Sequence, residues 1–146
     1  MEQVAHAVSN PPAGVLASVL ASRAAADMVI MVREGSGIRL DYTPASLSLV
    51  DRIIDGIRRE KPPAEALTDT LTGFGAYLGE VLVRCAGAAW VDFDPAQRDI
   101  FGQPFGIRTP DGRVWNPLGK AAKRYRNGPE DSLRLFYLSV VGQARV

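Results

Sequence analysis

The sequence predicts one α+β domain with three N-terminal helices, a small antiparallel sheet of two or three strands and two C-terminal helices. Apolar residues recur at helical spacing up to about residue 85 and again after residue 116. Between these regions, residues 90–115 alternate with period two and contain turn signals. With 146 residues, of which 47% are hydrophobic and 23% charged, the chain has the composition of a globular protein. We therefore expect a single domain over residues 13–146.

Proline and glycine mark the ends of the first two helices. Residues 1–12 end in two prolines, so we expect a flexible N-terminal lead there. The first helix is expected from about residue 14 to residue 33, and a short extended piece at residues 38–42. Thr43-Pro44 offers a capping hydroxyl before a proline at the first helical position. These residues therefore start a second helix, which ends near Glu60.

The third helix, from about Ala64 to Cys85, is apolar on almost every side. A helix of this kind is normally buried. Its apolar segment, Leu71 to Trp90, carries one acid, Glu80, and one base, Arg84, a turn apart, with Tyr77 adjacent. Because a buried carboxylate must be paired or have a shifted pKa, two interpretations follow. One is a general base or ligand contact with Arg84 holding an anion; the other, which we favour, is a structural ion pair to the sheet or the basic helix.

Glycines and tryptophans indicate close packing around this helix. Gly75 and Gly79 lie one turn apart inside it, and an interior glycine costs about 1 kcal/mol relative to alanine. We expect another helix or strand to approach closely there. Gly73-Phe74-Gly75 matches neither the dinucleotide fingerprint nor the P-loop, so no nucleotide site is expected. Trp90 and Trp115, on different predicted strands, are assigned to packing, with a ligand-stacking pair as the alternative.

The sheet is predicted from three short segments. Residues 90–93 alternate, and Asp94-Pro95 ends that strand. Residues 105–109 and 113–115 flank Pro110-Asp111-Gly112, which has proline and glycine where a tight turn needs them. We expect these strands to pair in the antiparallel sense.

Two helices follow the sheet. The first opens at Asn116-Pro117 and runs to about residue 126. Asn127-Gly128-Pro129 ends it and starts the last helix, whose first turn is expected to hold Glu130 and Asp131, because the helix dipole favours acids there.

Basic residues gather on the helix after the sheet. This basic cluster consists of Lys120, Lys123, Arg124 and Arg126, with Tyr125 interleaved. Bases with an aromatic among them can hold phosphates and stack on nucleobases, which keeps weak nucleic-acid binding through residues 120–126 as an alternative. The net charge of the whole chain is only +1. We therefore interpret the cluster as solvated or paired within the molecule, with Glu80 or Asp92 as partners.

Composition argues against several classes of protein. One cysteine, Cys85, cannot form an internal disulfide, and one histidine, His6, leaves little for a metal site or a His-dependent nucleophile. No cofactor or metal is expected. The apolar run over residues 13–32 contains Arg23 and Asp27 near its centre. Two charges at that position make a membrane-spanning helix unfavourable. We expect a cytoplasmic protein that makes no membrane contact.

The order of four landmarks resembles a small uncharacterised bacterial domain family over about residues 38–140. The landmarks are Leu40-Asp41-Tyr42-Thr43-Pro44-Ala45-Ser46-Leu47, Gly75-Ala76-Tyr77-Leu78-Gly79-Glu80-Val81, Trp90, and Asn116-Pro117 with its basic helix. The most specific part is Tyr-Leu-Gly-Glu on a helix ahead of a tryptophan-bearing strand. The resemblance implies a compact cytosolic α+β domain and assigns no activity to any residue.

Missing catalytic machinery and ordinary composition favour a non-enzymatic accessory protein, adaptor-like or immunity-like, that binds another protein. The alternative is a small-molecule binder or enzyme whose pocket opens where the third helix meets the basic helix. The candidate binding residues for that pocket are Tyr77, Glu80, Arg84, Lys120, Lys123 and Arg124. Whether the chain forms a homo-oligomer is left open.

Overall fold

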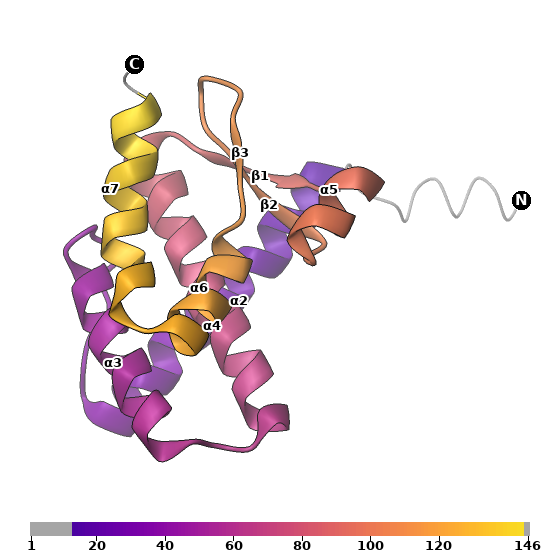
Figure 1. Ribbon diagram of the computed structural model, residues 1–146. Helices are drawn as coiled ribbons and strands as arrows, with labels where there is room; N and C mark the ends of the chain where they lie inside the picture. Colours follow the sequence, from indigo (N-terminus) through magenta and orange to yellow (C-terminus); the bar gives the residue numbers. More distant parts are fainter. Residues whose placement is uncertain (1–12, 145–146) are drawn as a thin grey trace, which may run out of the picture.

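The computed structural model describes residues 13–144, which form six α-helices, a 3₁₀ turn and three short strands (Figure 1). The expected flexible lead at residues 1–12 and the last two residues lie outside the described part. The helices are α2 (Ala13–Ser36), α3 (Ser46–Glu60), α4 (Ala64–Ala86), α5 (Pro95–Phe101), α6 (Pro117–Asn127) and α7 (Leu133–Ala144). The strands are β1 (Ala89–Asp92), β2 (Phe105–Arg108) and β3 (Val114–Trp115), and the 3₁₀ turn is η1 (Pro129–Asp131). The predicted α+β class is confirmed, with one helix more than expected.

Helix α4 forms the centre of the fold. Residues 73–82 are all buried, because α2 packs along one side of the helix and α6 along another. Figure 1 shows α4 between α2 behind it and α6 in front. The sequence prediction that a helix apolar on all sides runs through the middle of the fold is therefore confirmed.

The glycines of α4 mark where its neighbours come closest. A methyl group built on Gly79 would overlap the ring of Trp90 from β1. One built on Gly75 would lie 2.6 Å from the Cα atom of Leu118 and 2.9 Å from the carbonyl oxygen of Pro117, both on α6. The expected close approach of a strand and a helix is confirmed. The cost of two helical glycines is thus offset by packing that a side chain would prevent.

The three strands form an antiparallel sheet in the order β1-β2-β3, with Trp90 opposite Ile107 and Ile107 opposite Trp115. Between β1 and β2 the chain forms α5, which the sequence analysis treated only as a strand break. Its start is a capping box: Asp94 accepts a hydrogen bond from the Gln97 amide, and the Gln97 side chain accepts one from the Asp94 amide.

Residues 38–41 connect α2 to α3 without forming a helix or a strand, and the chain turns at Tyr42, whose φ is 63°. One further expectation needs correction. Glu130 and Asp131 belong to η1 and not to the last helix, which begins at Leu133. The Asp51 carboxylate of α3 accepts hydrogen bonds from the first amides of α7, so an acid from another helix occupies the position where Glu130 and Asp131 were expected.

We expect Gly79→Ala to lower the free energy of unfolding by about 2–4 kcal/mol, because the new methyl group would displace a buried indole. Gly56→Ala in α3 is the matched control. Its methyl group would meet only a flexible arginine at 3.7 Å, so it should raise stability by about 0.5–1 kcal/mol. Urea unfolding followed by circular dichroism measures both, and equal effects of the two substitutions would contradict this account.

Candidate functional site

The Glu80 carboxylate lies in the interior, with 4% of the residue exposed, where α2, α4 and β1 meet. The indole N–H of Trp90 donates to its Oε2 at 2.8 Å, and the Ser22 hydroxyl donates to its Oε1 at 3.1 Å. Arg84 approaches the same Oε1 at 3.5 Å with a side chain that is half exposed. Two neutral donors are thus closer to the carboxylate than the cation is. The ion pair of Glu80 is therefore with Arg84 of the same helix, not with the sheet or the basic helix as we had favoured. The link from Glu80 to the sheet is the neutral hydrogen bond from Trp90.

Tyr77 and Arg84 are joined through Tyr42, a residue that the site prediction did not include. The Tyr77 hydroxyl accepts a hydrogen bond from the Tyr42 amide at 2.8 Å and shares another with the Ser46 hydroxyl at 2.6 Å. The two tyrosine rings stack at 5.0 Å, and the Arg84 guanidinium lies 3.6 Å from the Tyr42 centroid. Burial raises the pKa of Tyr77. Through these contacts, Tyr42, Tyr77 and Arg84 hold the segment before α3 against α4.

Arg124 is directed to a different part of the molecule. It is 2% exposed, and its guanidinium contacts Asp51 Oδ1 at 3.0 Å and Asp55 Oδ2 at 2.9 Å, both on α3. The Asp51 carboxylate also accepts hydrogen bonds from the Ser132 hydroxyl and the Leu133 amide. The expected intramolecular pairing of the basic cluster is correct for Arg124, but Glu80 and Asp92 were the wrong partners. This network joins α3, α6 and the start of α7.

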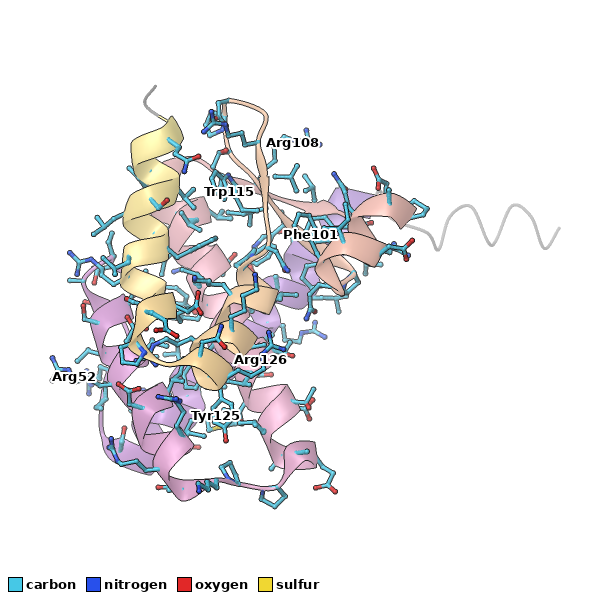
Figure 2. All side chains as sticks on the ribbon, in the orientation of Figure 1. Arg52, Phe101, Arg108, Trp115, Tyr125 and Arg126 are labelled. Carbon is cyan, nitrogen blue, oxygen red and sulfur yellow. The ribbon has the colours of Figure 1, made fainter. Side chains whose placement is uncertain are left out.

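The two lysines of the cluster lie on the sheet side of α6. Lys120 forms an ion pair with Asp131 at 2.7 Å, and its hydrogen bond lowers the pKa of that carboxyl. Both lysines line a small cavity of about 230 Å³ that also contacts Phe101 and Trp115. Figure 2 labels these two aromatic residues. Lys123 is exposed at this cavity. The predicted site residues therefore fall into three separate places: one around Glu80, one where Arg124 of α6 meets α3, and one where the two lysines lie beside the sheet.

A larger cavity lies elsewhere in the described chain and was not predicted from the sequence. It is a groove of about 450 Å³ between the C-terminal ends of α2 and α3 and the N-terminal part of α4, which we call the α2–α3–α4 groove. Its lining consists of Met28, Met31, Val32, Gly35, Ser36, Ile53, Ile57, Glu60, Pro62, Ala66, Leu67, Thr70 and Phe74. The apolar stripe of α3 contains a pattern that could have indicated this groove. Leu47, Val50 and Ile54 already fill the core, whereas Ile53 and Ile57 are only half-buried and face this groove.

Comparison with protein-family models, with curated proteins and with solved structures gave no match to this chain. The resemblance to a small bacterial domain family therefore stays a prediction. Within residues 13–144, no helix combines the length and apolar character that crossing a bilayer requires. The same part of the chain contains no cluster of three or more His, Cys, Asp or Glu side chains that could hold a metal ion.

We expect Glu80→Ala to lower the free energy of unfolding by about 3–5 kcal/mol, because it leaves the Trp90 N–H buried without an acceptor. Arg84→Ala should cost less than about 1 kcal/mol, since that side chain is half exposed and its ion pair is long. Thermal and denaturant unfolding of both variants measure this difference. A loss for Arg84→Ala as large as that for Glu80→Ala would show instead that the cation holds the acid in place.

The Asp55–Arg124 pair predicts a pH dependence of stability. The hydrogen bond from Arg124 lowers the pKa of Asp55 in the folded state. The stabilisation is therefore complete above the unfolded pKa of about 4 and is lost as the pH falls through the lower folded value. Asp55→Asn should be less stable than the wild type at pH 7, and the gap should close below about pH 4. Asp69→Asn, which removes an exposed acid outside this network, is the control; a gap independent of pH would contradict the assignment.

Proposed function

We propose that this chain is a non-enzymatic interaction protein that binds an apolar helix of another protein in the α2–α3–α4 groove. The observation that carries the proposal is the lining of the groove, which is apolar apart from Glu60 and two hydroxyl residues. Met28 and Met31, the methionines of the described chain, both line it. Methionine side chains are flexible and polarizable, and they are over-used on surfaces that accommodate partner helices.

The charge at the rim favours a partner with a cation. Glu60 is the last residue of α3 and is exposed, and it forms no ion pair with any residue of the described chain. The C-terminal end of a helix disfavours an acid, so this carboxylate would gain from a nearby positive charge. A fitting partner helix therefore presents large apolar side chains at helical spacing, with a lysine or arginine on the rim side.

The state of the other polar candidates supports a binding role in preference to a catalytic one. Glu80 and Arg124 are buried and hydrogen-bonded within the domain, and the Tyr77 hydroxyl is bonded to the segment before α3. Groups held in this way orient the fold and are not directed at a substrate. We further propose an adaptor-like or immunity-like role in a bacterial cytoplasm, which the single cysteine and the family resemblance support.

A photo-crosslinking side chain at position 67, on the α4 wall of the groove, tests the proposal in cells of the source organism. The same group at position 135, on the exposed face of α7, is the matched control. We expect a protein captured at 67 and not at 135. Binding of that purified protein should weaken about 20-fold or more with Ile57→Glu and about 5-fold with Glu60→Lys.

Leu135→Glu and Glu130→Lys introduce the same chemical changes on other surfaces and should alter the affinity less than about 2-fold. Because Glu60 is exposed, its reversal tests the groove even if Ile57→Glu unfolds the domain. The proposal would be overturned if the partner protein were captured equally at positions 67 and 135. It would also be overturned if neither Ile57→Glu nor Glu60→Lys changed the affinity for that protein. A small apolar compound released from the purified protein in native mass spectrometry, and lost with Ile57→Glu, would make the groove a ligand pocket instead.

A further inference from the structure

Helix α2 has one face that no other element within residues 13–144 covers. Its inner face contacts α4 and β1 and buries small and apolar side chains, namely Ala17, Ala21, Ala25, Met28 and Val32. The opposite face carries Leu16, Leu20, Arg23, Asp27, Ile30 and Glu34, which we call the α2 outer stripe. Its three apolar members are each 46% exposed, and they are flanked by Val19 at 47% and Met31 at 55%. A soluble monomer gains nothing from so many exposed aliphatic side chains on one helix face.

The spacing of the outer stripe is that of a coiled-coil seam. Successive members are four, three, four, three and four residues apart, the pattern that keeps one face of a helix against a partner helix. Arg23 and Asp27 occupy the two central positions. Although they lie one turn apart, no ion pair or hydrogen bond joins their side chains to each other or to any other described residue. Both charges are exposed and available to a partner.

The stripe is complementary to itself when it runs in the opposite direction. A twofold axis at the level of Ala25 places each residue opposite the one equally far on the other side of Ala25. Arg23 then faces the partner subunit's Asp27, and Leu20 faces the partner subunit's Ile30. Each dimer therefore contains two cross-subunit ion pairs at its centre and an aliphatic contact on each side of them, and at each end of the stripe Leu16 lies opposite the partner subunit's Glu34. We infer that this chain forms a symmetric antiparallel dimer through the outer faces of α2.

The surrounding residues fit such a contact. Ala26 is exposed next to the axis, and its small side chain leaves room for a second helix. The stripe runs from residue 16 to residue 34, so the shared seam is about 27 Å long. Contact along one helix pair is at the small end of specific interfaces, which predicts a dissociation constant of about 1–100 µM. No residue of the outer stripe itself lines the α2–α3–α4 groove, although the flanking Met31 does, so the inference rests on residues other than those that carry the proposed function.

Sedimentation of the full chain over a concentration series tests the inference. We expect the wild type to be mainly dimeric at about 200 µM and to dissociate on dilution. Arg23→Asp places two acids opposite each other, and Asp27→Arg places two bases opposite each other. Each should weaken the dimer about 10-fold or more. The double variant Arg23→Asp/Asp27→Arg restores both pairs and should return the dissociation constant to within about 3-fold of the wild type.

Mixing the two single variants gives the sharpest result. At these two positions the Arg23→Asp chain presents only acids and the Asp27→Arg chain only bases, so both ion pairs re-form in a heterodimer. Because the two chains differ in mass, the heterodimer can be distinguished from either homodimer. Leu135→Glu on α7, which packs on α3, α4 and α6, is the control and should leave the dimer unchanged. A wild type that is monomeric at every concentration would overturn the inference. The inference would also be overturned if neither Arg23→Asp nor Asp27→Arg changed the dissociation constant of the dimer, or if mixing the two variants gave no heterodimer.

Discussion

The indole of Trp90 packs closely against Gly79 while its N–H donates to Glu80, one residue further along α4. Each half of this contact requires the other: the glycine makes room for the ring, and the carboxylate fixes the ring's orientation. Because Ser22 donates to the same carboxylate, α2 is attached at the same point. The position of the sheet relative to the two longest helices therefore depends on one acid and one missing side chain. A hydrophobic residue at position 80 could fill the space, but it would leave the indole N–H without an acceptor.

A second network fixes the C-terminal half. The carboxylate of Asp51 accepts from the guanidinium of Arg124 and from the first amides of α7, so it acts as an ion-pair partner and a helix cap at once. Since Arg124 is almost fully buried, this pairing specifies how α3, α6 and α7 meet more than it adds net stability. Both networks use the strongest polar groups of the chain inside the molecule. On the outside, exposed or half-buried apolar side chains gather on α2 and at the α2–α3–α4 groove, next to exposed charges such as Arg23, Asp27 and Glu60.

Sequence reasoning succeeded where one element was enough to define the outcome. The burial of α4 follows from its own composition, and the close approach at Gly75 and Gly79 follows from the cost of glycine in a helix. It failed where partners come from distant segments. Asp51 lies 73 residues from Arg124, and nothing in the spacing of either residue indicates the other. The groove was missed for the same reason, because three helix ends form it together. Helix α5 is a different case: Asp94 and Gln97 have capping-box spacing, but the proline between them was interpreted as a break.

The two faces of α2 are under different structural constraints. Its inner alanines are needed because α4 and β1 pack closely against them, and larger side chains would push the helix away. The outer stripe has no such role within the domain. Its two charges argue against a membrane span in the sequence, and in a dimer they would select one arrangement. A parallel pairing in register brings Arg23 against a second Arg23, whereas the antiparallel one brings it against Asp27. Charges at seam positions specify the direction and register of a helix pair at some cost in affinity. Arg23 and Asp27 would therefore weaken the apolar contact between two copies of α2 and at the same time specify its antiparallel arrangement.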